Sequence, residues 1–304
     1  MQLIGQLAAL GTSFFFSIGP IFFTMAGRLT SAAIVNRTRL VFATIILMLV
    51  HWLIYGSPIP FSAALDRWWW LGLSGVIGLT LGDAALFQAF VQIGTRLTML
   101  VFSTSPVFAA LMAWLFLGET LAPIQWIGII ITVLGVTWTI SERQVSSDNP
   151  TENQSRNRVY LMGLFFALLG ALGQASGLIT AKLGLYGDFP ALSGQVIRMG
   201  IGAIAIWIVP LIRGQLSATI NAFRNNPKAF RYISIAVFFG PVVGVYLSLV
   251  AVQFAPIGIA STLMALPPII LIPIDRFYFK EQISSRAIWG TIIAILGVAI
   301  LFLS

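Results

Sequence analysis

Charged side chains inside otherwise apolar segments are the residues of this sequence that could do chemistry. The clearest are Arg37, Arg39, Asp83, Lys182 and Arg198. A charge at the centre of a lipid bilayer costs about 2.5–3.5 kcal/mol, so each such residue is a candidate for a functional role. Arg37 and Lys182 lie near the ends of their segments, where we expect a long side chain to extend to the lipid headgroups instead.

Asp83 is the candidate proton carrier. It lies beside a stripe of small residues that permits close contact between helices: Gly75, Gly78 and Gly82. A lone buried carboxylate is a natural proton acceptor, which favours a role in a proton or substrate pathway. The alternative is a permanent ion pair with Arg39 or Arg96 that only fixes the packing of the helices.

Arg39 and Arg198 lie at equivalent positions of two similar halves, which a shift of 159 residues superimposes. A residue present in both copies favours a role in the scaffold, such as pairing with carbonyl groups at helix ends. Contact with a substrate or a gate is the alternative, and the sequence leaves it open.

Two prolines mark a second candidate site. Pro106 and Pro268 fall at corresponding places in the two halves. A proline removes a backbone donor and frees a carbonyl group one turn earlier, and matched interruptions in two halves are typical of a transport site. A packing kink is the alternative. Three polar side chains are further candidates for lining the pathway: Gln88, Ser103 and Ser105.

Metal, cofactor and nucleophilic chemistry have little support in the sequence. It contains no cysteine and a single histidine, His51, which we expect at the membrane interface. Disulfides, thiolate nucleophiles and clusters of Cys or His ligands are therefore excluded. No GxxxxGKS or GxxxxGKT motif for nucleotide phosphates is present. We expect no metal and no cofactor, and an energy source in an ion gradient or in substrate exchange.

The composition indicates which kind of element must position these residues. Of the 304 residues, 58% are hydrophobic and 9% are charged, and the mean hydropathy is +0.96. Soluble domains carry about 25% charged residues. The net charge of +8 comes from short basic segments between long apolar runs, which is typical of a membrane protein and not of a nucleic-acid-binding protein.

Ten stretches approach the roughly 20 apolar residues that a helix needs to cross a bilayer. We expect an all-α polytopic membrane protein with transmembrane helices near residues 4–26, 33–55, 69–91, 97–117, 122–140, 159–183, 191–213, 232–253, 258–275 and 286–303. The first has no basic segment before it and no clear cleavage site, so it predicts a retained helix and not a signal peptide. Residues 141–158 are polar throughout and predict a linker between half-domains of residues 1–140 and 159–304.

The two halves superimpose in sequence when the first is shifted by 162 residues. The matching pairs are Gly78 with Gly240, Gly82 with Gly244, Pro106 with Pro268, Glu119 with Glu281, Gly128 with Gly290, and Gly135 with Gly297. Each half holds five predicted helices. Because five is an odd number, the second half must enter the membrane from the opposite side. The sequence therefore predicts two inverted five-helix repeats, an architecture typical of secondary transporters.

The motifs around these matched residues resemble the EamA repeat of the drug/metabolite transporter superfamily. The first copy is Ser105-Pro106-Val107-Phe108 with Gly118-Glu119-Thr120, Gly128 and Leu134-Gly135-Val136; the second is Pro267-Pro268 with Lys280-Glu281, Gly290 and Leu296-Gly297-Val298. Lys280 departs from the glycine usual in this family. The resemblance implies that Glu119 and Glu281 are structural residues at helix junctions, where each would cap the following helix.

These observations predict a secondary active transporter of small metabolites, amino acids or drugs, working by alternating access around a midplane cavity and most simply as an exporter. The expected partners are a small-molecule substrate, a coupling proton or counter-substrate, and the lipid of the cell inner membrane, with no nucleic acid. A passive channel or facilitator is the first alternative. An intramembrane enzyme is the less favoured one, because it would need paired catalytic groups that the sequence does not offer.

The orientation of the chain is predicted differently by charge and by resemblance. Most basic residues fall on the face that bears the central linker, so the positive-inside rule places the termini outside and the linker in the cytoplasm. Resemblance to ten-helix relatives implies cytoplasmic termini. We favour the charge bias, because it is large and lies in short loops.

Overall fold

The computed structural model describes residues 2–116, 121–140, 150–187, 189–254, 263–277, 280 and 282–303. These residues form helices and short connections, with no strand among them, in agreement with the all-α prediction. The elements of the first half are α1 (Gln2–Leu29), α2 (Ala32–Tyr55), α3 (Leu65–Ser74), the π-helix η1 (Gly75–Gly82), α4 (Asp83–Ile93), α5 (Thr95–Phe102), α6 (Ser105–Phe116) and α7 (Pro123–Ile140).

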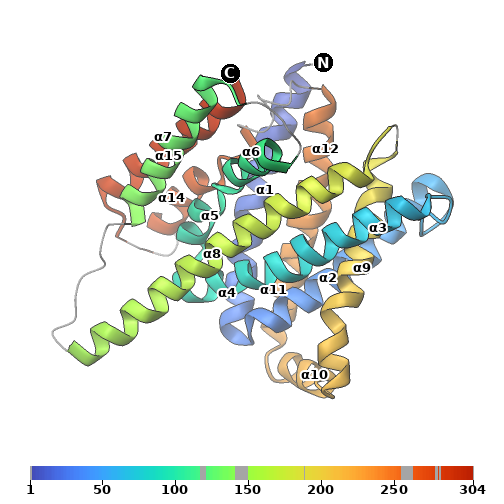
Figure 1. The fold of residues 1–304 in the computed structure, drawn as a ribbon. Coiled ribbons are helices and arrows are strands. Elements are labelled where there is room, and N and C mark those ends of the chain that lie inside the picture. Colours follow the sequence, from blue (N-terminus) through green and yellow to red (C-terminus); the bar gives the residue numbers. More distant parts are fainter. Residues whose placement is uncertain are drawn as a thin grey trace.

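The second half follows a similar order, with one additional helix, α10, and is shown with the first in Figure 1. Its elements are α8 (Pro150–Gly184), α9 (Ala191–Ile212), α10 (Leu216–Asn225), α11 (Pro227–Val237), the π-helix η2 (Phe238–Gly244), α12 (Val245–Phe254), α14 (Pro267–Phe277) and α15 (Ser285–Leu303). α8 begins at Pro150, inside the segment assigned to the linker, because proline is well suited to the first position of a helix.

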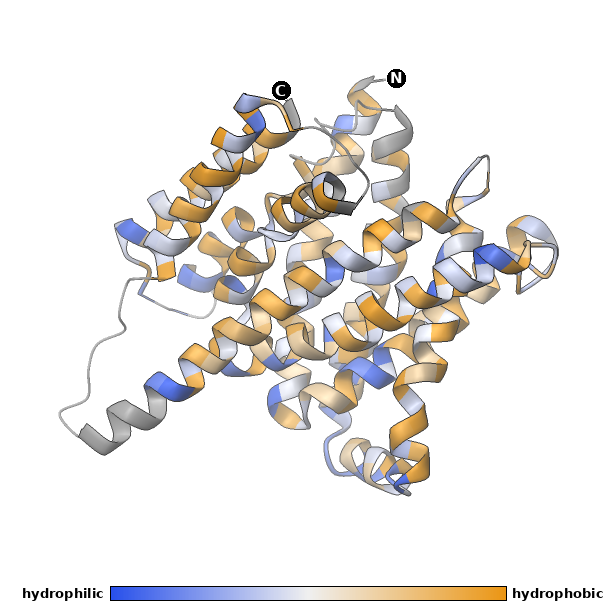
Figure 2. Cartoon of the chain, in the orientation of Figure 1, coloured by the Kyte–Doolittle hydropathy of each residue, from blue (hydrophilic) through white to orange (hydrophobic). Residues whose placement is uncertain are grey.

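Seven helical spans among the described residues are long and apolar enough to cross a membrane. They are Leu3–Leu29, Ala32–Tyr55, Leu65–Ile93, Thr95–Met112, Pro123–Ile140, Asn157–Ala181 and Ala191–Ile212. Hydrophobic residues cover the helices along most of their length (Figure 2), and many large apolar side chains are exposed on the outside. The chain is therefore a multi-pass membrane protein, and a total of ten spans remains a prediction.

Equivalent helices of the two halves pack against each other in opposite directions. In α7 and α15, a Cβ on Gly128 would lie 2.8 Å from the carbonyl oxygen of Gly297, and a Cβ on Gly290 would lie 2.9 Å from that of Gly135. Residue numbers rise along α7 as they fall along α15, so the two helices are antiparallel (Figure 1). The shift of 162 residues converts each of these contacts into the other, as a two-fold relation between inverted repeats requires.

The first helix of each half packs against the third helix of the other half. The third helix is the continuous run of α3, η1 and α4 in the first half, and of α11, η2 and α12 in the second half. α1 contacts α11, η2 and α12, whereas α8 contacts α3, η1 and α4. Small residues permit both crossings, since Gly19 lies against Gly240 and Gly177 lies against Gly78. Each half therefore supplies one side of the other half's packing, and neither forms a separate bundle.

The third helix of each half contains a π-helical segment at the matched glycines. η1 ends at Gly82 and η2 ends at Gly244, which are equivalent in the 162-residue shift. A π-helix is rare and occurs most often near functional sites. η1 leads directly into Asp83, the first residue of α4.

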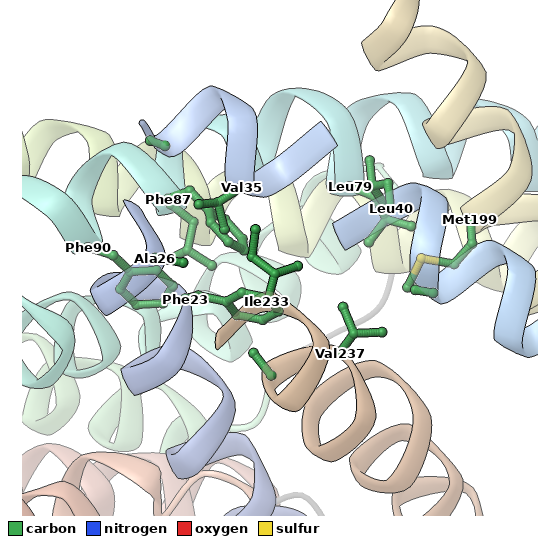
Figure 3. Close-up of a cluster of buried hydrophobic side chains, with 14 of the residues drawn as sticks. Phe23, Ala26, Val35, Leu40, Leu79, Phe87, Phe90, Met199, Ile233 and Val237 are labelled. Carbon is green, nitrogen blue, oxygen red and sulfur yellow. The ribbon is translucent and has the colours of Figure 1, made fainter. Parts of the chain in front are cut away.

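A buried apolar cluster joins the halves near these segments (Figure 3). It includes Phe23 of α1, Leu40 of α2, Phe87 of α4 and Met199 of α9, together with Ile233 of α11. Two of these side chains, Phe23 and Phe87, also lie next to the guanidinium of Arg39.

Candidate functional site

Two arginines of α2 face different neighbours. The helix begins after Ser31, whose hydroxyl accepts a hydrogen bond from the backbone N–H of Ile34 at 3.3 Å. Arg37 and Arg39 are two residues apart, which places their side chains about 200° apart around the helix axis. Both are buried, and their surroundings decide what each can do.

Asp83 forms an ion pair with Arg39. The Nη2 of Arg39 donates to Oδ2 of Asp83 and also to Oδ1 of Asn36, at 3.1 Å. Asn36 in turn donates from Nδ2 to the carbonyl oxygen of Leu79 in η1, at 3.4 Å. The guanidinium of Arg39 lies 5.1 Å from the ring centroid of Phe87. α2, η1 and α4 are thus joined by one buried polar network.

Of the two ion-pair partners left open for Asp83, the structure selects Arg39. The other, Arg96 at the start of α5, instead pairs with Asp275 of α14 at 3.5 Å between Nε and Oδ2. The pair between Arg96 and Asp275 therefore connects α5 in the first half to α14 in the second half. Whether Asp83 also carries a coupling proton remains a prediction.

Arg198 of α9 lies against η1, close to Asp83. The two charges interact electrostatically, and Nη2 of Arg198 lies 3.9 Å from the position of a Cβ on Gly78. A Cβ on Gly75 would overlap the carbonyl group of Arg198, so glycine is required for this close approach of η1 to α9. The glycines Gly75, Gly78 and Gly82 therefore do permit close helix contact, as the sequence predicts.

In each half, an amide side chain three residues before the arginine accepts a hydrogen bond from its guanidinium. Arg198 donates from Nη1 to Oε1 of Gln195, at 3.2 Å, as Arg39 donates to Asn36 three residues before it. Shifting Asn36 and Arg39 by 159 residues gives Gln195 and Arg198. The expected pairing with helix-end carbonyl groups is wrong for these contacts: a side-chain amide one helical turn away positions each guanidinium.

Two residues expected at the membrane interface, Arg37 and His51, are buried within the protein. The guanidinium of Arg37 lies 5.3 Å from the ring centroid of Trp207, and the Nε1 of Trp207 donates to the carbonyl oxygen of Arg37. His51 is buried between α2 and α9, with Nε2 2.9 Å from Oγ of Ser193. Both residues therefore connect α2 to α9.

The proline positions are helix interruptions in both halves, as predicted. Residues 103 and 104 separate α5 from α6, and residues 265 and 266 precede α14. The backbone N–H of Thr104 donates to Val101 at 3.0 Å, and that of Leu266 donates to Leu263 at 3.4 Å. These two bonds are equivalent in the 162-residue shift, so the two interruptions share this backbone hydrogen bond.

The hydroxyl groups near the first interruption are used locally. Ser103 donates to the carbonyl oxygen of Leu100 at 2.6 Å. Ser105 is buried and Gln88 is half-buried. Among the described residues, no hydrogen bond or ion pair joins Gln88, Ser103 or Ser105 to Arg39, Asp83 or Arg198. The structure thus brings the three charged candidates together, and in the part of the chain that it describes they receive no polar contact from the candidates near Pro106.

Some predicted positions lie outside the described residues. These are Glu119, Glu281 and the side chain of Lys182. Within the described part of the chain, no group of three or more His, Cys, Asp or Glu side chains that could hold a metal ion is found.

Comparisons with known proteins agree with this architecture. The model of the EamA-like transporter family matches residues 3–141 and again residues 161–303. A solved structure described as "Crystal structure of protein" is similar in fold, with a TM-score of 0.57 and 12% identity, over 100% of this chain and 98% of that chain. No curated protein matches the sequence.

Proposed function

Because the chain belongs to the EamA-like transporter family, a family of membrane transporters for small solutes, we propose that it is a secondary active transporter working by alternating access, in the direction of export. The observation that carries this proposal is the antiparallel contact of the equivalent helices α7 and α15. It relates the two halves as inverted repeats, and alternating access in such folds is a movement of one repeat unit against the other.

A difference between the halves supports two alternating states. α2 packs against α4 of its own half, whereas the equivalent helices α9 and α12 do not pack together in this way among the described residues. Both helices also contact the other half: α9 packs against α3 and η1, and α2 packs against α11 and η2. Similar sequences in unequal arrangements are what alternating access between two inverted repeats would produce in a state that is open to one side only.

The ion pair between Arg96 and Asp275 supports closure at one end of the pathway. It joins the start of α5 to the last turn of α14, which belong to different halves. Asp275 is buried and the side chain of Arg96 is 20% exposed, so the contact lies near the surface of the bundle. Opening of that end would break this pair.

A flux assay with the purified protein in liposomes tests the proposed function. The panel comprises amino acids, sugars, organic anions and cationic dyes, each with and without substrate or a proton gradient on the opposite side. A secondary transporter gives saturable flux that is accelerated by one of these conditions. Flux that is independent of both would identify a passive channel.

Replacing either proline with alanine is expected to change transport kinetics in a folded protein. Pro106→Ala restores a backbone N–H that can bond the carbonyl group of Phe102, and Pro268→Ala does the same for Met264. Each change favours a continuous helix across the interruption, and we expect the transport rate to fall about tenfold or more, since a proline break is worth roughly 3 kcal/mol.

Pro123→Ala is the matched control. Pro123 is the first residue of α7 and follows the non-helical residues 121 and 122, whereas Pro106 follows a two-residue break after α5. Initial rates measured over a range of substrate concentrations separate the two roles. Wild-type rate and affinity in both Pro106→Ala and Pro268→Ala would show that these prolines only kink the scaffold.

A further inference from the structure

The buried charges of the described residues do not balance. The buried arginines are Arg37, Arg39 and Arg198, and the buried aspartates are Asp83 and Asp275. Asp83 pairs with Arg39, and Asp275 pairs with Arg96. Among the described residues, the other two buried guanidinium groups, those of Arg37 and Arg198, form no ion pair at contact distance, although the charges of Arg198 and Asp83 interact.

Arg198 is buried, like Arg37, and is only partly hydrogen-bonded. It is 9% exposed, and within the described structure its Nε has no hydrogen-bond partner, as is also true of the Nε atoms of Arg37 and Arg39. Its partner through Nη1 is Gln195, a neutral amide. A buried charge without a compensating charge is costly, and the energetic cost falls when an anion binds to it.

Comparison of the halves shows which group is missing at Arg198. In the first half, an amide, an arginine and a carboxylate stand together as Asn36, Arg39 and Asp83. The second half repeats the amide and the arginine as Gln195 and Arg198. Position 245, which matches Asp83, is valine, so the second half supplies no equivalent carboxylate.

Arg37 is stabilised in another way. It lies in the second turn of α2, on the side away from Asp83, and its guanidinium lies over the ring of Trp207. A cation over an indole ring is attracted to the ring face. Arg37 therefore belongs to the contact between α2 and α9 and serves as a comparison for Arg198.

We propose that Arg198 binds the oxyanion of a small organic anion, a carboxylate or a phosphate, and that this anion is the transported substrate. The inference rests on the proposed transport function and specifies its substrate class. Arg39, Asp83 and Arg198 together carry one net positive charge, which a singly charged anion neutralises. The nearby Asp83 repels a second negative charge, so a carboxylate monoanion is favoured over a phosphate dianion.

A series of ligands that differ only in charge on one ring tests this proposal in the purified full-length protein. The probes are benzoate, phenyl phosphate, benzamide, benzylammonium and phenylalanine at constant ionic strength. Binding is measured as the rise in the unfolding temperature followed by tryptophan fluorescence, and transport is measured in liposomes. We expect saturable binding of benzoate at concentrations at least about tenfold below those needed for benzamide or benzylammonium.

Variants locate the site. Arg198→Gln is expected to weaken benzoate binding about 10- to 100-fold, as for loss of a charge-assisted hydrogen bond. Arg37→Gln removes another buried arginine and should leave benzoate affinity unchanged. If Arg198→Gln does not fold, Arg198→Lys keeps the charge without the planar fork; it should still prefer benzoate to benzamide, with weaker affinity.

The outcomes separate this proposal from the transport function. Equal binding of benzoate, benzamide and benzylammonium, or undiminished benzoate binding by a folded Arg198→Gln protein, would overturn the anion site. Transport of a neutral solute or a cation without benzoate binding would also overturn it, while supporting the transport function. Benzoate binding without flux of any solute would support the site and contradict the transport function. Tighter binding of phenyl phosphate than of benzoate would identify phosphate as the preferred oxyanion.

Discussion

Replacing Asp83 with asparagine is expected to abolish accumulation of substrate driven by a proton gradient and to lower the stability of the protein. The variant leaves the guanidinium of Arg39 buried without its carboxylate, and removal of one member of a buried ion pair costs about 3–5 kcal/mol. Asparagine keeps an oxygen that accepts a hydrogen bond from Arg39, so the protein should still fold. Accumulation in liposomes and the unfolding temperature in detergent measure the two effects.

The double variant Asp83→Asn with Arg39→Gln separates coupling from packing. Since it removes both charges, it should recover most of the stability lost in either single variant. Accumulation should remain absent if Asp83 carries the coupling proton, while exchange of substrate across the membrane is retained. Recovery of proton-driven accumulation together with stability would identify Asp83 as a structural partner of Arg39 only.

Replacing Gly297 with alanine is expected to push α15 away from α7 and to lower the stability of the protein. The new Cβ would overlap the backbone nitrogen of Thr132 and would lie 2.7 Å from the carbonyl oxygen of Gly128. Backbone atoms inside a helix cannot move away as a flexible side chain can. An inserted methyl group that must shift a well-packed contact costs about 1–3 kcal/mol, and Gly297→Leu should cost more.

Gly200→Ala is the matched control for this contact. Gly200 lies within α9, and a Cβ there would be 4.0 Å from the side chain of Thr44, an ordinary contact distance. Alanine is also the better helix former, so this variant should be as stable as the wild type or more stable. The unfolding temperature and the yield of monodisperse protein compare the variants. A Gly297→Ala protein as stable as Gly200→Ala would show that the α7–α15 contact is not required for assembly.

The repeat and its interruptions could be predicted because they depend on residue types that have few substitutes. Gly135 and Gly297 match in sequence, and both are required where two helix backbones meet. Pro106 and Pro268 match as well, and each lies in the first turn of a helix that begins directly after an interruption, because proline cannot continue a preceding helix. In these cases, the local chemistry of one residue determines the local structure.

The contacts of the charged residues could not be predicted, because they depend on distances between helices. The sequence offered Arg39 and Arg96 equally as partners of Asp83, and only the packing of α2 on α4 selects Arg39. The burial of Arg37 depends on Trp207, which is 170 residues away in the chain. The π-helical segments were not predicted either, since no single residue type specifies them. One available signal was missed: the amide three residues before each arginine, Asn36 and Gln195.

The unequal packing of α2 and α9 has a consequence for the energetics of the transport cycle. If the halves exchange conformations, the opposite-facing state has α9 packed on α12 and α2 withdrawn from α4. Arg39 then leaves Asp83, and a carboxylate left in an apolar environment must acquire a proton or another cation. Protonation of Asp83 and reorientation of the protein are then coupled equilibria. Each event favours the other by the same free energy. The membrane's proton gradient would act on the cycle through the making and breaking of this single ion pair.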